Sequence, residues 1–241
     1  MNPPQMGLKF CGVTVLADLL TTIKLKIDYV GFNFWPGSKR FMTPAAARQH
    51  WLEAGKIWKD QHGAAFSTQA VGLLVNPQEA DVRRVLDEFP EIHGLQLHGQ
   101  EDLPCVRAVR AMIQPRFVWK ALPVFRQEDL AQISSWRSDV DLILLDAAVT
   151  QGAAGILQSG GLGLSFDWGL LDRPDVKEVL RQGPWGLAGG IHAGNLREAM
   201  EREPYLIDLC SGIEQKPGAK DEEKMQRVVK IYHGDRHGKK D

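Results

Sequence analysis

Short runs of apolar residues alternate with longer amphipathic stretches along the whole chain. Eight of these runs are candidate strands: Leu8–Cys11, Tyr29–Phe34, Ala70–Val75, His93–Leu97, Phe117–Leu122, Leu142–Asp146, Trp185–Ala188 and Leu206–Cys210. Most of their positions are apolar, without the alternation expected of a strand with one face in water. This pattern is typical of strands buried on both faces of a parallel sheet.

The stretches between the runs carry signals for helices. Thr43 and Pro44 precede AAARQHW, which gives a capping hydroxyl and then a proline at the first helical position. Asn76 and Pro77 precede QEADVRRVLDEF in the same arrangement, so we expect another helix to begin there. Further helices are expected to open after three other good N-cap residues, Asp167, Asn195 and Asp221.

The number of strand–helix units indicates the fold. Eight units in 241 residues, without a compositional break or a Ser/Pro-rich linker, favour a single (β/α)₈ barrel over two domains. The predicted domain covers residues 1–241 and ends in a frayed polar tail at about 233–241. A doubly wound open sheet is the alternative, but Cys11-Gly12-Val13-Thr14 does not match the GxGxxG dinucleotide fingerprint expected after its first strand.

Composition and charge restrict the possible classes of function. The chain is 44% hydrophobic and 24% charged with a formal net charge of −1, so nothing indicates nucleic acid or an anionic membrane as a partner. No apolar run approaches the roughly 18 residues needed to span a bilayer, and MNPPQMGLKF does not resemble a secretory signal. Three widely spaced cysteines argue against a disulfide framework or a zinc knuckle and fit a reducing compartment. We therefore expect a cytoplasmic enzyme.

Reactive side chains follow the apolar runs, at the end of the barrel where such enzymes hold their active sites. Cys11 closes the first run, and a thiolate there can act as a general base if nearby positive charge lowers its pKa. Asp146 ends the apolar run LILLD, where an unpaired carboxylate is costly. The alternatives are an inert buried thiol and a hydrogen-bonded structural carboxylate.

Paired small residues end the last two runs, Gly189-Gly190 and Ser211-Gly212. The corresponding loops of barrels often bind phosphate through backbone N–H groups, although paired glycines also form ordinary turns. Arg40 lies in the loop after the second run and either holds a carboxylate through two hydrogen bonds or is solvated at the surface. His98 is either a donor to substrate oxygens or a structural residue.

Several segments, in order along nearly the whole chain, resemble the phosphoribosylanthranilate isomerase family of tryptophan biosynthesis. They are LKFCGVT, VGFNFWPGSKRFMTPAAAR, VGLLVN, LQLHG, WKAL, ILLD, FDW, LAGGI, IDLCSGIE and PGAKD. The resemblance implies a (β/α)₈ barrel that catalyses an Amadori rearrangement. The implied substrate is N-(5-phosphoribosyl)anthranilate, the product is 1-(2-carboxyphenylamino)-1-deoxyribulose 5-phosphate, and neither a cofactor nor a metal is expected.

The resemblance also implies roles for individual residues. Asp146 is expected to be the general acid that protonates the ribose ring oxygen, and Cys11 the general base that removes a proton from the sugar carbon. Arg40 is expected to hold the anthranilate carboxylate, with His98 and Asp208 as further substrate-binding residues. The phosphate-binding residues would be Gly189, Gly190, Ser211 and Gly212. The expected partner is this phosphorylated small molecule, and the expected assembly is a monomer or a homodimer.

The sixth loop departs from the family pattern. In GGLGLSFDW, Leu162 replaces a small hydroxyl residue, Leu164 a basic residue and Ser165 a threonine. The segment from Asp146 to Asp167 is also longer than is usual in the family. A long loop there can act as a lid, and the lost basic residue removes one possible contact to phosphate.

Two single positions also depart from the family pattern. Cys210 stands where serine is common and is expected to change packing only, while Leu74 stands where an aromatic residue is common and is expected to loosen one wall of the site. Two alternative functions stay open, the first of which is motivated by the altered sixth loop. One is a paralogous isomerase of a different aminated ribose phosphate, and the other is a non-catalytic ligand-binding barrel.

Overall fold

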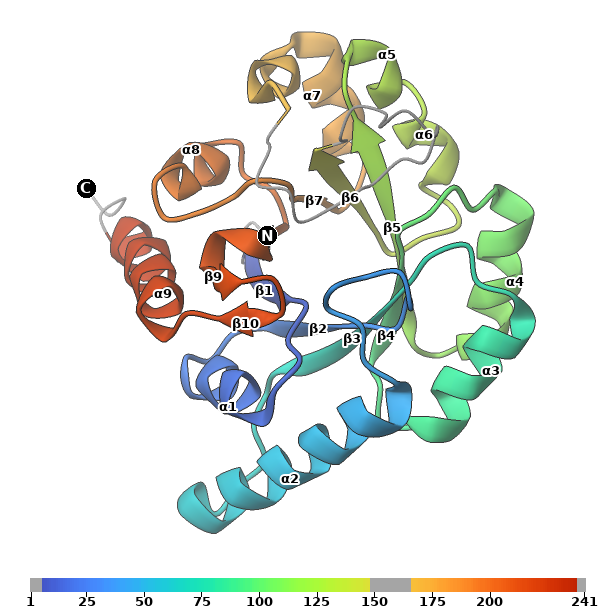
Figure 1. Cartoon of the computed structure of the whole chain (residues 1–241). Coiled ribbons are helices and arrows are strands. Elements are labelled where there is room, and N and C mark those ends of the chain that lie inside the picture. The colour runs from blue at the N-terminus through green and yellow to red at the C-terminus, as the bar shows by residue number, and fades with distance from the viewer. Residues whose placement is uncertain (1–5, 148–165, 238–241) are drawn as a thin grey trace.

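The eight apolar runs form a closed barrel of parallel strands with helices around it (Figure 1). The structure is a computed structural model that describes residues 6–147 and 166–237. The strands are β1 (Gly7–Cys11), β2 (Tyr29–Asn33), β3 (Gln69–Leu74), β4 (Gly94–Leu97), β5 (Phe117–Val124), β6 (Leu142–Ala147), β7 (Trp185–Leu187) and β8 (Leu206–Leu209). Each pairs with the next along the chain, and β8 closes the barrel on β1. The predicted fold class is confirmed, and the predicted strand ends are correct to within one or two residues.

Helices cover the outside of the barrel. The α-helices are α1 (Leu16–Lys24), α2 (Pro44–His62), α3 (Glu79–Glu88), α4 (Leu103–Ile113), α5 (Gln127–Leu130), α6 (Ile133–Trp136), α7 (Pro174–Arg181), α8 (Leu196–Glu201) and α9 (Glu222–His237). Two 3₁₀ helices are η1 (Trp168–Asp172) and η2 (Ser211–Ile213). A short antiparallel pair, β9 (Glu214–Lys216) and β10 (Ala219–Lys220), follows β8 and was not predicted.

The start of α2 is as predicted, whereas that of α3 is not. The Thr43 hydroxyl accepts a hydrogen bond from the backbone N–H of Ala46, 3.2 Å away. Asn76, the predicted cap of α3, instead has a φ of 46°, and its side chain accepts from the N–H of Gln100 at 2.7 Å. Asparagine tolerates this left-handed conformation. Its side chain connects the loop after β3 to the loop after β4, and the N-cap of α3 is Gln78, two residues further along the chain.

The other predicted helix starts are confirmed in position. Asp167 accepts from the N–H of Gly169, although the helix that follows is of the 3₁₀ type. Asp221 accepts from the N–H of Lys224 at the start of α9. Helix α9 continues to His237, through the first part of the region where a polar tail is predicted, and residues 238–241 lie outside the described residues.

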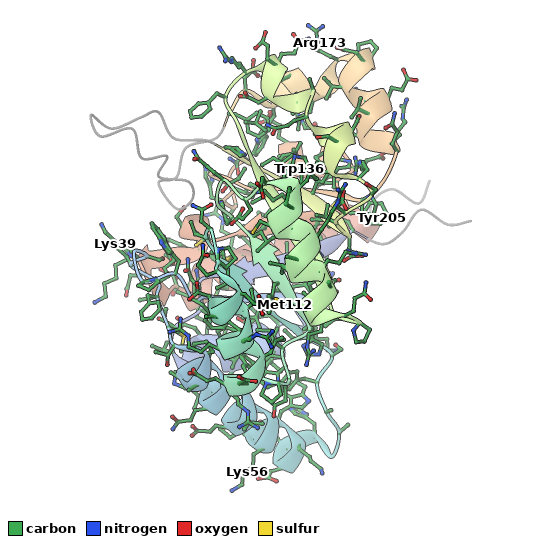
Figure 2. The ribbon with its side chains drawn as sticks, turned by 90° about the vertical axis from the view of Figure 1, so that its right-hand side faces the viewer. Lys39, Lys56, Met112, Trp136, Arg173 and Tyr205 are labelled. Carbon is green, nitrogen blue, oxygen red and sulfur yellow. The ribbon has the colours of Figure 1, made fainter. Side chains whose placement is uncertain are left out.

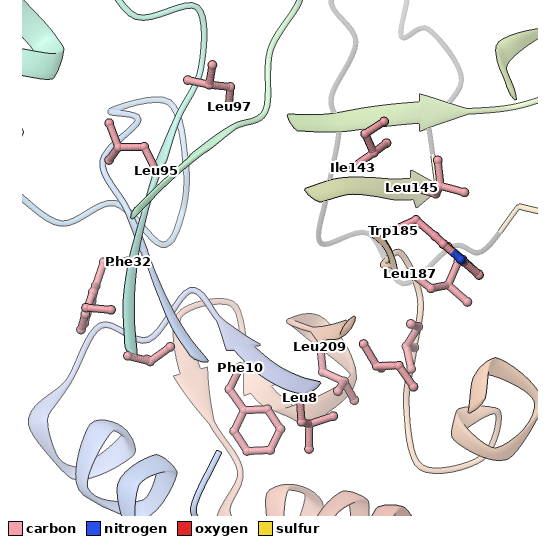
Figure 3. Packing of buried hydrophobic residues seen from close by; sticks show 14 of the residues in the cluster. Leu8, Phe10, Phe32, Leu95, Leu97, Ile143, Leu145, Trp185, Leu187 and Leu209 are labelled. Carbon is pink, nitrogen blue, oxygen red and sulfur yellow. The ribbon is translucent and has the colours of Figure 1, made fainter. Parts of the chain in front are cut away.

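Successive side chains of a strand point to opposite faces of the sheet, so the apolar side chains form two separate cores. Leu142 and Leu144 belong to a small cluster inside the barrel. Ile143 and Leu145 belong to the larger cluster, which lies between the barrel and the helices (Figure 3). Full burial of each such leucine or isoleucine contributes about 1.5–3 kcal/mol. Leu74 also belongs to the larger cluster, so the prediction that it loosens a wall of the site is wrong.

Charged side chains cover the helical shell. Lys56 and Arg173 extend outward from it and are exposed (Figure 2). Among the helices of the described residues, none is long and apolar enough to cross a membrane.

Candidate active site

Successive side chains of each strand point alternately into the barrel and toward the helices. At the carboxyl-terminal end of the barrel, several of the inward side chains are polar. Leu144 lies inside the barrel, so Asp146, two residues further along β6, faces the same side. The same alternation turns Lys9 and Cys11 of β1 and Asp208 of β8 to the interior, since Phe10 and Leu209 face the helices. Cys210 follows directly after β8. The ends of β1, β4, β6 and β8 thus supply the candidate site.

His98 and Asp146 meet across this end of the barrel. Nε2 of His98 lies 2.9 Å from Oδ2 of Asp146, although β5 separates their strands in the sheet. Nδ1 of His98 lies 3.2 Å from Nε2 of Gln96. The two ring nitrogens of His98 therefore contact the Gln96 amide on one side and the Asp146 carboxylate on the other. Both side chains are largely buried, which favours a fixed contact.

Lys9 and Asp208 form a buried ion pair below Cys11. Nζ of Lys9 lies 2.8 Å from Oδ2 of Asp208, and their strands pair in register at these two residues. Burial opposes the charge of Lys9, but the Asp208 carboxylate and the Cys11 thiol outweigh it and raise the pKa of Lys9. Oδ1 of Asp208 is buried and has no hydrogen-bond partner among the described residues. The pair thus supplies a fixed cation and a carboxylate oxygen that can accept from a ligand.

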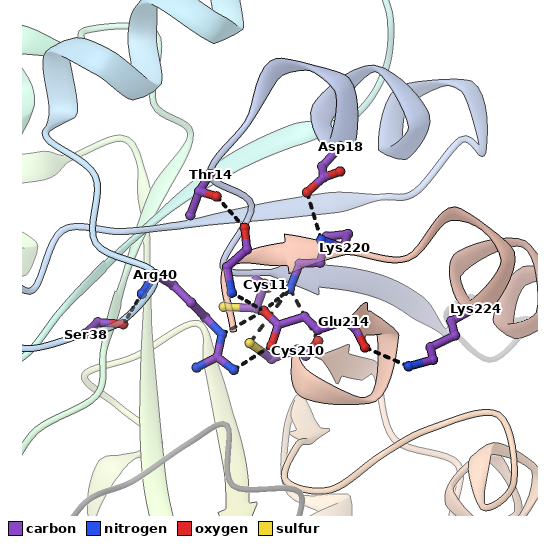
Figure 4. Close-up of polar contacts among 10 residues, drawn as sticks. Cys11, Thr14, Asp18, Ser38, Arg40, Cys210, Glu214, Lys220 and Lys224 are labelled. Atoms are coloured by element: carbon purple, nitrogen blue, oxygen red, sulfur yellow. Dashed lines mark hydrogen bonds and ion pairs between the residues drawn. The ribbon is translucent and has the colours of Figure 1, made fainter. Parts of the chain in front are cut away.

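Cys11, the last residue of β1, and Cys210, directly after β8, are neighbouring thiols (Figure 4). The hydrogen bond to Cys210 and burial raise the pKa of Cys11, against the opposing effect of Lys9. The same hydrogen bond lowers the pKa of Cys210 to about 7, against burial and with help from the Lys220 and Arg40 cations. Cys210 is therefore the more easily ionised of the two thiols, and its contact with Lys220 goes beyond the packing change expected of it.

An ion-pair network lies beside the two cysteines. Nε and Nη2 of Arg40 lie 2.8 and 2.6 Å from the two carboxylate oxygens of Glu214. Nζ of Lys220 lies 3.0 Å from Glu214, donates to the carbonyl oxygens of Cys11 and Cys210, and lies 3.9 Å from the Cys210 sulfur (Figure 4). Nη1 of Arg40 donates to no group within the described residues, so the outer edge of its guanidinium can still bind an anion.

The loops after β7 and β8 pack directly against each other. Gly189 and Gly190 have φ values of 83° and 63°, which favour glycine, and their N–H groups donate to no acceptor in the described part of the chain. A Cβ atom at Gly212 would lie 1.9 Å from the carbonyl oxygen of Ile191. Asn195 donates to the carbonyl of Gly190 at 3.0 Å and thereby fixes the first loop. The hydrogen-bonding capacity of this loop thus remains available to a ligand.

Asn195 occupies the N-cap position of α8, as predicted, but its side chain does not form the predicted capping hydrogen bond. Its Oδ1 accepts from the N–H of His192 at 2.8 Å, while its amide bonds Gly190. A residue at the N-cap position thus holds the loop that leads into the helix.

The predicted site residues fall into three groups. Cys11, Arg40 and Asp208 lie around the ends of β1 and β8, His98 and Asp146 bridge β4 and β6, and the small residues Gly189, Gly190, Ser211 and Gly212 lie in the last two loops. Leu162, Leu164 and Ser165 lie outside the described residues. Within residues 6–147 and 166–237, no cluster of three or more metal-ligating side chains is found.

Sequence reasoning missed the cations Lys9 and Lys220, the carboxylate Glu214 and the role of Cys210. One signal was available: Lys9 is a charged residue in an apolar strand, two positions before Cys11 and therefore on the same face. Another polar strand position, Lys120, lies outside the site. It is buried on the helix-facing side of β5 and pairs with Glu101 at 2.8 Å.

Comparison with known proteins gives one consistent family. Residues 8–231 match the model of "N-(5'phosphoribosyl)anthranilate (PRA) isomerase". A protein of that name from Zymomonas mobilis subsp. mobilis is 32% identical over 222 residues, covering 92% of this chain and 95% of the relative.

Solved structures agree with this match. The crystal structure of phosphoribosyl anthranilate isomerase from Thermotoga maritima is 29% identical, with a TM-score of 0.77, covering 95% of this chain and 100% of that one. A phosphoribosyl anthranilate isomerase in complex with reduced 1-(o-carboxyphenylamino)-1-deoxyribulose 5-phosphate is 27% identical, with a TM-score of 0.75 and the same coverage of both chains.

Proposed function

The chain belongs to the N-(5'-phosphoribosyl)anthranilate isomerase family, and we propose that Cys11 and Asp146 are the general base and the general acid of its reaction. The substrate is N-(5'-phosphoribosyl)anthranilate, and the product is 1-(2-carboxyphenylamino)-1-deoxyribulose 5-phosphate. The reaction needs a proton delivered to the ring oxygen, and then a proton removed from the second sugar carbon. Two groups on different strands suit these opposite tasks.

Asp146 delivers the first proton. A protonated carboxyl group donates to the ribose ring oxygen, the ring bond to the first carbon breaks, and the nitrogen lone pair forms a Schiff base. The contact of His98 with Asp146, at 2.9 Å, supports this role because the imidazole, once protonated from solvent to imidazolium, can hand a proton back to the carboxylate. His98 therefore holds the Asp146 carboxyl group in position and returns a proton to it.

Cys11 removes the second proton. The thiol passes its own proton along the hydrogen bond to Cys210, which leaves a Cys11 thiolate next to the Lys9 cation. The thiolate takes the proton from the second carbon, and the electron pair moves to form an enolamine that tautomerises to the ketone. The cation stabilises the thiolate in a buried site where an isolated charge would be costly.

Three contacts support binding of the substrate. The free edge of the Arg40 guanidinium suits the anthranilate carboxylate, and the unpartnered Oδ1 of Asp208 suits a sugar hydroxyl. The loops that contain Gly189, Gly190, Ser211 and Gly212 suit the phosphate, because backbone N–H groups there are available to an anion. The most important single support is the meeting of His98 and Asp146 at the end of the barrel that also holds Cys11.

Turnover of two substrates by the purified chain tests this function. We expect isomerisation of N-(5'-phosphoribosyl)anthranilate and no activity on an aminoimidazole-type phosphoribosyl substrate. Preference for the second substrate would support the paralogous isomerase, for which Leu164 in place of a basic residue is the motive. Turnover of neither would support a non-catalytic barrel.

A cellular assay tests the same proposal in the cytoplasm, where we place this protein as a monomer or homodimer. The gene should restore growth without tryptophan to a strain that lacks this isomerase, and the Cys11→Ala and Asp146→Asn variants should not. Growth with either variant would contradict the assigned acid and base.

A further inference from the structure

The ends of β1 and β8 bring two cysteine side chains together at the same level of the barrel. Lys9 pairs with Asp208 and Phe10 with Leu209, so the residues that come next are Cys11, the last of β1, and Cys210, directly after β8. One layer below, the side chains of Lys9 and Asp208 meet at 2.8 Å, which shows that inward side chains in this register touch. The side chains of Cys11 and Cys210 lie next to each other one layer above, and each shifts the pKa of the other (Figure 4).

The spacing of the two neighbouring strands that lead to the cysteines allows a disulfide. Neighbouring strands lie about 4.7–4.9 Å apart, within the range of about 4.4–6.8 Å that separates the Cα atoms of bonded cysteines. Lys220 donates to the backbone carbonyls of both cysteines and so holds the two strand ends together from one side. Little backbone movement is therefore needed to join the sulfurs.

We propose that Cys11 and Cys210 form a peroxide-sensitive dithiol site, in which an intramolecular disulfide reversibly removes the catalytic base. This inference depends on the proposed function in one respect only, that Cys11 is the catalytic base. The modifying agent is a hydroperoxide, and the agent that reverses the reaction is a low-molecular-weight thiol or dithiol.

The chemistry proceeds in two balanced steps. The Cys210 thiolate attacks one peroxide oxygen, the O–O bond breaks, and the leaving hydroxide takes a proton to become water, which leaves a sulfenic acid. The Cys11 sulfur attacks this sulfur, the S–O bond breaks, and the second oxygen leaves as water with the remaining protons. The two sulfurs lose two electrons and the peroxide gains them, so that two thiols and one H₂O₂ give one disulfide and two waters.

The surroundings indicate that Cys210 reacts first. Its sulfur lies 3.9 Å from Nζ of Lys220, and its side chain is more exposed than that of Cys11. Cys105 offers an internal comparison, because burial and the nearby carboxylates of Glu101 and Asp102 raise the pKa of its thiol. A thiolate beside a cation reacts faster than a thiol kept protonated.

The test uses the reduced, full-length protein with H₂O₂ as the oxidant, followed by alkylation of free thiols and peptide mass mapping. We expect a linked pair of peptides containing Cys11 and Cys210 to form at least about tenfold faster than Cys105 is oxidised. Isomerase activity should fall in proportion to the linked fraction and should return with dithiothreitol. The Cys105→Ser variant should form the same link, and the Cys210→Ser variant should form none. The isomerase rate of each treated variant is compared with that of the same variant before treatment.

The two proposals fail in different ways. If Cys105 is oxidised while Cys11 and Cys210 remain unlinked, the dithiol site is wrong, whatever the activity does. If the link forms quantitatively but turnover of the linked protein is unchanged, Cys11 is not the base and the disulfide does not control the enzyme. Peptide mass mapping detects the first outcome directly, without a measurement of isomerase activity.

Discussion

Nε2 of His98 lies 2.9 Å from Oδ2 of Asp146, across the carboxyl-terminal end of the barrel. The contact joins β4 to β6 over the intervening β5, so it depends on barrel closure and on no local sequence feature. A carboxyl group held by an imidazole has a fixed direction and a nearby source of protons. The acid of this site is therefore better described as a pair of residues than as Asp146 alone.

Replacement of His98 tests this relationship. In His98→Gln the substituent cannot return a proton to Asp146, so kcat should fall about tenfold or more, while KM changes less. Steady-state kinetics measures both constants. The exposed His62→Gln change is the matched control and should leave both unchanged. Equal turnover by the His98 and His62 variants would show that the contact has no role in proton delivery.

The two-thiol arrangement predicts a specific pH dependence. The pair must carry one negative charge for Cys11 to act as base, and the pKa of Cys210 is lowered to about 7 by its hydrogen bond from Cys11 and by nearby cations. Activity of the natural protein should therefore rise as pH increases through about 7. In Cys210→Ser, the serine does not ionise and burial still raises the pKa of Cys11, so the rise should move to higher pH.

The measurement is kcat as a function of pH for the natural protein, Cys210→Ser and, as a control, Cys105→Ser. The control should keep the natural profile, because Cys105 lies in α4, outside the site. A Cys210→Ser profile that rises at the same pH as the natural one, or at lower pH, would mean that Cys210 does not take the proton of Cys11.

The contact between the last two loops predicts an effect on phosphate binding. A methyl group in Gly212→Ala would lie 1.9 Å from the Ile191 carbonyl oxygen, so one loop must shift away from the other. We expect KM to rise about tenfold, which corresponds to a loss of about 1.4 kcal/mol in binding. Competition by inorganic phosphate should weaken in parallel. In Gly55→Ala, where the nearest atom would be 3.9 Å away, both measurements should stay as in the natural protein.

A buried ion pair outside the site predicts a stability effect. Lys120 and Glu101 are both buried and pair at 2.8 Å, so Glu101→Gln leaves a lysine without its counter-charge. The free energy of unfolding should fall by about 3–5 kcal/mol. Urea denaturation followed by tryptophan fluorescence measures it. The exposed pair of Glu79 and Arg83 provides the control, and Glu79→Gln should cost less than about 1 kcal/mol. Similar losses in both variants would contradict the difference in burial.

The barrel could be predicted from the sequence because its signals are local. Apolar runs such as Leu142–Asp146 mark strands buried on both sides, and Thr43 marks the start of a helix through a contact three residues away. The error at Asn76 has a non-local cause. Its side chain bonds the backbone of Gln100, in the loop after the next strand, and no pattern near residue 76 contains that contact.

The members of the site could be predicted in part, and their relationships could not. Position at a strand end singled out Cys11, His98 and Asp146, but their pairing depends on which strands face each other after closure. For Cys210 the sequence indicates only a conservative change in packing, since serine is common at this position in the family. The pKa of Cys210 is lowered by Cys11 and by Lys220, and both contacts form only when β1, β8 and the hairpin after β8 come together.

The central claim is that Cys11 and Asp146 perform the base and acid steps of one isomerisation. The most direct measurement is kcat on N-(5'-phosphoribosyl)anthranilate for Cys11→Ser and Asp146→Asn, with circular dichroism to verify folding. Each substitution nearly preserves the size of the side chain and removes its proton-transfer chemistry. The account predicts that each folded variant loses about 100- to 10,000-fold in kcat. Turnover within about twofold of the natural rate in either variant would contradict it.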